Sequence, residues 1–388
     1  MLVAIAGLKH FFPILREALH VPEEPTVPQR LTHAFMIPAE AARFPLFTAF
    51  PPAFGNAVRH FYTETGMAPL SQEKRGLLIR RILVLPLMLL LVLLTGTELT
   101  LRFVFGLGNP VLVAPDSACG YILKPNQNIK RFFCRTRTNR YGMRSDPVPE
   151  EPVPGTLRLL FLGDSVTYGT SRVDQSDLFT QILHRELPSI VHRPVEVLNA
   201  SASAWAIDNE LSYLRSRGTF HSDLVLLVLN SGDPGQPRAQ IQDVGEDSVL
   251  RHSRTAIGEL WSRLIAPRFL HTGARTDAGD ASAVNAAAVI HANLTDLDAM
   301  HAFAENHRAR LAIIYIPFRR EIPTPASQAQ ELLHTWAQSN HIPILDMTSA
   351  EAAFPTKEIT LDGAHLNKKG NAVVAHTVEK QWNTALGS

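Results

Sequence analysis

Cysteine and net charge are both scarce in this sequence of 388 residues. Only two cysteines are present, Cys119 and Cys134, so the chain forms at most one disulfide, across a short loop, or keeps two separate buried thiols. Lys and Arg together number 37 against 36 for Asp and Glu, so no net field attracts nucleic acid or repels an acidic substrate. Partners must therefore be inferred from local features of the chain.

Metal-binding motifs are also missing. The 16 histidines include no His-Glu-x-x-His pair and no Cys/His spacing of the kind that binds zinc. We therefore expect neither a metal site nor a cofactor. The 45% hydrophobic content is ordinary for a globular protein, and the length allows one large domain with additional segments.

One long apolar run is present near residue 90. No charged residue interrupts the chain from Ile82 to Thr97, and Arg81 and Arg102 at its flanks have stems long enough to reach the surface of a bilayer. We predict a transmembrane helix over residues 77–105. A buried core helix is the alternative for a run of this length.

The charges around this run predict its orientation. Lys74, Arg75, Arg80 and Arg81 precede it, whereas Arg102 alone lies near its carboxyl end. The positive-inside rule then places the amino terminus in the cytoplasm and the bulk of the chain in the periplasm or outside the cell. No small-residue cleavage site closely follows the run, which favours a retained anchor over a removed signal peptide.

The first residues are rich in proline, with "VPEEPTVPQ" and "FPPAFG" among them. Residues 1–76 are therefore predicted to be a poorly ordered cytoplasmic extension. A second interpretation starts the chain at Met67, in which case the first 66 residues do not belong to the natural product.

Residues 106–155 follow the predicted helix as a mixed, basic segment. Its stretch "LKPNQNIKRFFCRTRTNRYGMR" alternates charged and apolar residues, and predicts a small hairpin around Asn139 and Gly142. The charges favour a solvated strand face, with a site for an anionic glycan as the alternative. The proline linker "DPVPEEPVPG", residues 146–155, then marks a domain boundary.

Residues 156–388 alternate short apolar runs with longer amphipathic stretches. This βαβ rhythm predicts an α/β domain, a flavodoxin-like three-layer αβα sandwich with a mostly parallel five-stranded sheet. The predicted strands are 157–162, 195–198, 223–229, 311–316 and 342–346, and the predicted helices are 176–187, 206–217, 284–307, 328–339 and 368–385. Ligands of such sheets bind at the carboxyl ends of the strands, and Ser165 follows the first strand. The long stretch 235–283 is expected to shape a substrate pocket.

Two short motifs at opposite ends of this domain carry catalytic residue types. "FLGDSVTYG" places Gly163, Asp164 and Ser165 after the first strand, and "LDGAHLNKKG" places Asp362 and His365 before the last helix. A serine hydroxyl is a weak nucleophile that needs a base within hydrogen-bond reach, and the base needs an orienting carboxylate. Asp362 and His365, three residues apart in a turn, supply both.

These motifs resemble those of the SGNH or GDSL-type hydrolases, over residues 157–385. The family opens with Gly-Asp-Ser and ends with Asp-x-x-His, so the resemblance implies Ser165 as nucleophile, His365 as general base and Asp362 as its partner. The α/β-hydrolase elbow is not matched, because Thr167 stands where Gly-x-Ser-x-Gly needs its second glycine.

The middle motifs depart from the family pattern. In "NASASAW", Ala204 replaces the family's oxyanion-hole glycine, and its backbone N–H survives although glycine is the residue that adopts positive φ freely. In "LNSGDP", Gly232 replaces the family's asparagine, while Asn230 lies two residues earlier on the same strand face. We expect an oxyanion hole from Ser165, Ala204, Asn230 and Gly232. Asn230 capping its own turn is the alternative.

The resemblance implies a serine esterase, and the apolar run with its flanking charges predicts that this esterase is membrane-anchored and extracytoplasmic. It would hydrolyse acyl esters, chiefly acetyl groups on carbohydrates, through an acyl-enzyme. Two alternatives stay open: an O-acyltransferase that modifies cell-surface polysaccharide, and a catalytically degenerate domain that only binds glycan. The expected partners are an acyl ester substrate, a glycan and the membrane, with no nucleic acid; the sequence indicates no oligomeric state.

Overall fold

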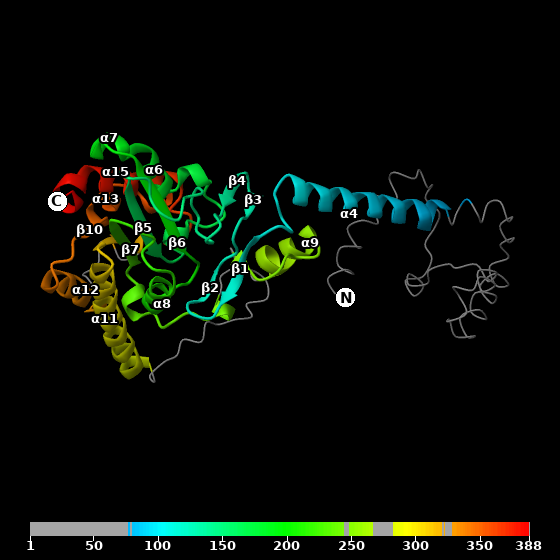
Figure 1. Ribbon diagram of the computed structural model, residues 1–388. Helices are drawn as coiled ribbons and strands as arrows, with labels where there is room; N and C mark the ends of the chain where they lie inside the picture. Colours follow the sequence, from blue (N-terminus) through cyan, green and yellow to red (C-terminus); the bar gives the residue numbers. More distant parts are fainter. Residues whose placement is uncertain are drawn as a thin grey trace, which may run out of the picture. The chain divides into compact units, whose positions relative to one another are not determined.

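The computed structural model describes residue 77 and residues 80–243, 248–266, 282–319, 322 and 328–387. The predicted cytoplasmic extension and much of the predicted pocket-shaping stretch lie outside these residues. By its internal contacts the chain forms two units, Met1–Met88 and Leu89–Ser388. The catalytic motifs belong to the second unit (Figure 1).

A sheet of five parallel strands forms the centre of this unit. Its strands are β5 (Leu157–Gly163), β6 (Val195–Ser201), β7 (Leu224–Asn230), β9 (Arg310–Ile316) and β10 (Ile344–Asp346), in the order β10-β9-β7-β5-β6. This is the strand order of flavodoxin-like sheets, and it confirms the predicted α/β fold class. Gly163 pairs with Ser201 on one side and Val228 on the other, so three strands end together at one edge.

Helices cover both faces of the sheet (Figure 1). Every residue of β5 and β7 is buried, because side chains alternate between two cores. One core packs against α6 (Phe179–Glu186) and α15 (Lys368–Gln381). The other packs against α8 (Ile207–Arg217), α11 (Ser282–Asn306) and α12 (Gln328–Ser339). The three layers, and helices within a few residues of the predicted ones, confirm the expected architecture.

Shorter elements complete the described chain. The helices are η3 (Arg80–Val84), α5 (Ser165–Tyr168), η4 (Gln175–Asp177), α7 (Pro188–Val191), η5 (Asp233–Gly235), η6 (Ile241–Asp243), α9 (Ala256–Glu259), η7 (Leu260–Ile265), α13 (Thr348–Ala352), α14 (Thr356–Ile359) and η9 (Trp382–Leu386). Two of them, α5 and η5, follow strands β5 and β7 directly and are part of the candidate site.

The segment before the sheet contains two antiparallel strand pairs. β1 (Val111–Asp116) pairs with β2 (Gly120–Leu123), and β3 (Asn128–Arg131) pairs with β4 (Cys134–Arg137). β1 also pairs in parallel with the distant β8 (Ser248–Val249). The second hairpin reverses at Phe132 and Phe133, whose φ angles are 48° and 66°, and not around Asn139 and Gly142 as predicted. Gly142 instead closes a separate turn by donating to the Asn139 carbonyl at 3.1 Å.

This segment packs against the central sheet within the same unit. Tyr121 and Met143 are buried in the same core as Trp205 and Leu211, and Trp205 Nε1 donates to the Tyr121 carbonyl at 3.0 Å. The proline-rich stretch that follows is held by Arg158, whose buried guanidinium donates to the carbonyls at positions 149 and 150 at 3.0 and 2.8 Å. The residues before the sheet therefore support its loops.

The helix α4 (Leu85–Phe103) is long and apolar enough to cross a membrane. Its most apolar window has a mean hydropathy of 1.6, and none of its side chains is buried within the protein. A buried core helix, the alternative interpretation of this run, would instead be covered by other elements.

The two cysteines are free thiols. Cys119 is buried with its Sγ 3.3 Å from Asp116 Oδ1, whereas Cys134 Sγ lies 3.3 Å from the Arg172 carbonyl. Burial and the nearby Asp116 carboxylate raise the pKa of the Cys119 thiol to about 12. Of the two sequence alternatives, the structure has separate thiols.

Candidate active site

The nucleophile motif forms a tight strand-to-helix turn at the end of β5. Asp164 caps α5 by accepting from the Val166 N–H at 2.8 Å, and Ser165 is the first helical residue. A Cβ at Gly163 would lie 2.1 Å from Thr167 Oγ1, so only glycine fits there. The helix ends after one turn at Gly169, whose φ is 79°. The turn itself thus accounts for Gly163 and Asp164, and it places Ser165 at the start of α5.

The two sequence motifs meet at this turn. His365 Nε2 lies 2.9 Å from Ser165 Oγ, although the two residues are 200 positions apart. His365 Nδ1 lies 2.8 Å from Asp362 Oδ2 on the other side of the ring. Both distances are within hydrogen-bond reach, and the order hydroxyl, imidazole, carboxylate is the one that activates a serine.

The turn that carries the histidine is held by backbone hydrogen bonds. Asp362 Oδ1 accepts from the Ala364 and His365 N–H groups at 3.1 and 2.9 Å. Asn367 caps α15 directly afterwards by accepting from the Lys369 N–H at 2.9 Å. Burial opposes ionisation of Asp362, but these bonds and the His365 ring outweigh it and hold the pKa of this carboxyl below its ordinary value. The carboxylate therefore stays charged beside the imidazole.

The backbone N–H groups of Ser165 and Ala204 were both expected to bind an oxyanion. Ser165 N is at the first position of α5, where no helix carbonyl can accept its proton, although the Asp164 carboxylate lies within its reach. Ala204 has a φ of 65°, so alanine here adopts the left-handed conformation that glycine adopts most freely. Its carbonyl accepts from Gln236 Nε2 at 2.8 Å, while its N–H donates to no group among the described residues.

The other two expected donors are already used inside the protein. Asn230 Nδ2 donates to Asp164 Oδ2 and to Asp233 Oδ1, both at 3.0 Å, so both amide protons are bonded. Asn230 Oδ1 accepts the Gly232 N–H at 2.7 Å. The expectation that Asn230 and Gly232 donate to an oxyanion is therefore not met. The alternative holds, because Asn230 caps its own turn and bridges two carboxylates.

A group of buried acids lies behind the nucleophile, which the sequence analysis did not identify. Burial raises the pKa of Asp164, and burial together with the Asp164 charge raises the pKa values of Asp233 and Glu210 well above their ordinary range. Glu210 Oε2 has no hydrogen-bond partner in the described structure. The available signal was Asp233, which directly follows Gly232 in the third motif.

Further residues outside the motifs hold the loops of the site. Arg144, fully buried, donates to the carbonyls of Tyr168, Thr170 and Val173 at 2.6 to 2.7 Å, and so fixes the loop after α5. Tyr121 Oη donates to the Ser203 carbonyl at 2.5 Å, next to Ala204. Both come from the segment before the sheet, and nothing in the sequence alone linked them to the site.

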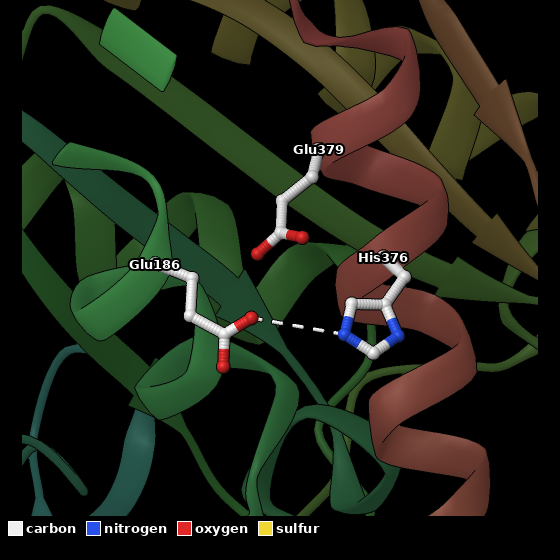
Figure 2. Close-up of side chains that lie close together, drawn as sticks. All are labelled: Glu186, His376 and Glu379. Carbon is white, nitrogen blue, oxygen red and sulfur yellow. Dashed lines mark ion pairs between the residues drawn. The ribbon is translucent and has the colours of Figure 1, made fainter. Parts of the chain in front are cut away.

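One group of side chains has the donor set of a metal site. Figure 2 shows Glu186 at the end of α6 facing His376 and Glu379 on α15, and their ligand atoms lie within 4.8 Å of one another. His376 Nε2 is 3.7 Å from Glu186 Oε2, and the His376 side chain is 63% exposed. Burial and the Glu186 charge raise the pKa of Glu379. Glu186 and His376 form an exposed ion pair on the surface of two packed helices, whereas Glu379 Oε1 is buried without a hydrogen-bond partner among the described residues.

No family model and no curated protein matches the chain. Among solved structures it is similar to TesA, with 13% identity, 58% of this chain and 98% of that chain covered, and a TM-score of 0.38. It is similar to CEX, a two-domain esterase active on acetylated mannans, with 12% identity, 60% and 50% coverage and a TM-score of 0.37. It is also similar to the psychrotrophic esterase EstA from Pseudoalteromonas sp., with 13% identity, 60% and 99% coverage and a TM-score of 0.38. Similarity at this level carries no argument about the reaction of this chain.

Proposed function

We propose that this protein is a serine ester hydrolase of the SGNH type. The observation that carries the proposal is the hydrogen-bonded row of Ser165, His365 and Asp362 at the carboxyl edge of the sheet. A serine with a base at 2.9 Å and an ionised carboxylate behind that base is the arrangement used for acyl transfer.

The proposed reaction has two acyl-transfer steps. Ser165 Oγ attacks the ester carbonyl while His365 Nε2 takes the hydroxyl proton, and Asp362 stabilises the imidazolium. The Ser165 and Ala204 N–H groups bind the oxyanion that forms. The tetrahedral intermediate then expels the alcohol, which receives the proton from His365. Water, deprotonated by the same imidazole, attacks the acyl-enzyme and releases the carboxylic acid and free Ser165.

Membrane anchoring through α4 is part of the same proposal. The cluster of Arg80, Arg81 and the preceding Lys74 and Arg75 at the start of the helix supports a cytoplasmic amino terminus, with the hydrolase domain outside the cytoplasm. Acetyl esters on carbohydrates are the proposed substrates at that location. A phosphatase reporter that works only outside the cytoplasm, fused after Ser388 in a bacterial cell, should be active; a silent reporter would reverse the orientation.

A second candidate function is glycan binding without catalysis. The observation that favours it is the loss of Asn230 and Gly232 as donors, since removal of one oxyanion donor can reduce turnover by roughly 100-fold to 1000-fold. Only an activated serine reacts with a fluorophosphonate, so that reagent separates the two functions.

The full chain in detergent should therefore be labelled by a fluorophosphonate at Ser165. Ser165→Ala, in which the oxygen alone is lost, is the matched control and should not be labelled. Absence of labelling in the unmodified protein would support glycan binding only. A panel of short-chain aryl esters and acetylated glycans then gives the substrate class, and capture of the acyl group by a sugar instead of water would identify an acyltransferase.

A further inference from the structure

Several large aromatic side chains are exposed around the carboxyl end of α4. The side chains of Phe103, Phe133 and Trp261 are 78%, 65% and 59% exposed, and Phe105 is 37% exposed. The rings of Phe105 and Phe133 contact one another edge to face, with centroids 5.8 Å apart. We call Phe103, Phe105, Phe133 and Trp261 the aromatic face. They come from three separate parts of the chain, which the Phe105–Phe133 contact and the bonds between α4 and α9 bring to the end of α4.

The helix that carries Trp261 is attached to the end of α4. Glu98 Oε1 and Oε2 accept from the N–H groups of Ala256 and Ile257 at 2.8 and 3.0 Å, so the carboxylate of α4 caps α9. Arg102 binds the same carboxylate at 2.7 Å and donates to the Arg254 carbonyl. Glu98, the one acidic residue of α4, is therefore used to fix a second helix beside the membrane segment.

The inner side of this second helix is fixed by a buried ion pair. Glu259 is 1% exposed, binds Arg131 Nη2 at 2.7 Å and accepts the Gly108 N–H through its other oxygen. Arg131 also donates to the Gly106 carbonyl at 3.1 Å. Trp261 follows two residues beyond Glu259, in η7, and its side chain is 59% exposed.

The charges near the aromatic face are basic. From Val249 to Ala266 the only acidic residue is the buried Glu259, which pairs with Arg263 at 3.5 Å, whereas Arg251 and Arg254 are exposed. Exposed aromatic rings together with arginines are the composition of proteins at the headgroup level of a bilayer. In water the same rings would expose a large apolar surface with nothing to cover it.

We propose that the aromatic face lies in the headgroup region of the bilayer that α4 crosses. Its continuity with the end of α4 and its basic surroundings identify phospholipid as the occupant. The hydrolase domain is then held against the membrane at a fixed orientation and does not swing on a tether. This inference rests on the proposed membrane anchoring, and it is independent of the proposed esterase activity.

The test uses the fluorescence of Trp261 in the full chain. Of the four tryptophans, Trp205, Trp336 and Trp382 are at most 9% exposed, so Trp261 is the one that a lipid can contact. The protein is placed in nanodiscs of mixed phosphatidylcholine and phosphatidylglycerol whose acyl chains carry bromine near the headgroup, and in the same lipids without bromine. Bromine quenches only indoles in contact with the lipid.

Brominated lipid should quench the unmodified protein, and Trp261→Phe should lose most of this quenching. Trp336→Phe, which removes a covered indole, is the matched control and should retain it. Quenching that persists in Trp261→Phe would overturn the proposal. Two results with the unmodified protein would also overturn it. In the first, bromine does not quench Trp261 but a water-soluble quencher does. In the second, neither quencher reaches Trp261, because a second copy or another protein covers it.

Failures of the underlying proposals give different results. If α4 did not enter the bilayer, the chain would not co-elute with the nanodiscs, and the aromatic face would have no lipid to contact. If the protein were not an esterase, the same nanodiscs would show no turnover of aryl esters while the bromine quenching of Trp261 remained.

Discussion

Removal of the Asn230 side chain separates the two roles considered for this residue. In the structure its amide bridges Asp164 and Asp233, and its oxygen accepts the Gly232 N–H just beyond the end of β7. Asn230→Ala removes these three hydrogen bonds at once. We expect the variant to lose folding stability, with any loss of turnover following from that loss.

The size of the effect follows from what is left behind. A buried polar group that loses its partner costs about 1 to 3 kcal/mol, and the substitution deprives the Gly232 N–H and one oxygen of each carboxylate of their Asn230 partner. Asp164 and Asp233 keep other bonds, to the N–H groups of Val166 and Asn230. Partial relaxation therefore limits the expected loss of folding stability to roughly 3 kcal/mol, the low end of the combined cost of these three groups.

Denaturant unfolding measures this loss, and aryl ester turnover well below the unfolding midpoint measures catalysis. Ser165→Ala is the control with the opposite pattern, since it should abolish turnover and leave the unfolding midpoint in place. An Asn230→Ala protein of unchanged stability whose turnover falls by roughly 100-fold to 1000-fold would refute the reasoning, because that is the effect of a lost oxyanion donor.

Four further predictions concern other parts of the site. Asp362→Asn should retain more turnover than His365→Ala, because the carboxylate orients the ring that moves the proton. Ala204→Gly should keep turnover, since the N–H remains, and should raise stability by about 1 kcal/mol or less in thermal unfolding, the net of left-handed strain and glycine entropy. Arg144→Met should lower stability by roughly 3 kcal/mol, because three buried carbonyls lose their donor. Burial raises the pKa of Glu210, so this group favours folding below its unfolded pKa of about 4.3 and opposes folding as the pH rises. Glu210→Gln should therefore be more stable than the unmodified protein at pH 8 but not at pH 4.

Each of these has a result that contradicts it. Equal and negligible losses in the first pair would remove the two residues from the mechanism. Ala202→Gly, at a buried position of ordinary φ, should lose stability; the same loss in Ala204→Gly would contradict the strain argument. An unchanged unfolding midpoint in Arg144→Met, or parallel pH profiles for Glu210→Gln, would refute the others.

The central sheet could be predicted because its longer strands are uninterrupted runs of apolar residues. β5 and β7 are continuous apolar runs, as parallel strands buried on both faces must be, and they are bounded by polar turns. The positions of Ser165, Asp362 and His365 followed from two local motifs whose spacing fixes a turn. The sequence therefore predicted correctly those elements whose conformation depends on residues adjacent in the chain.

The remaining features depend on residues distant in the sequence. Arg144 and Tyr121 act on loops more than 20 positions away, and neither lies in a pattern that distinguishes it from a surface residue. The place of Asn230 on a strand face did not predict its hydrogen-bond partners. From the end of β7 its amide could reach either Asp164 or an oxyanion at Ser165, and in the structure it bonds Asp164. The turn of the second hairpin was predicted at the wrong place because it lies at Phe132 and Phe133. Both residues adopt positive φ there, which phenylalanine does not favour.

The bond between Glu98 and α9 has a consequence for the order of folding. Its two ends are 158 and 159 positions apart. The Arg131–Glu259 pair and the β1–β8 pairing also join the segment after α4 to residues made much later. A chain that emerges from its amino end cannot complete these contacts until residue 259 has left the ribosome. Until then the nascent segment lacks its long-range partners, and such distant contacts slow folding. The junction at the end of α4, although synthesised early, therefore becomes native only after these much later residues are made.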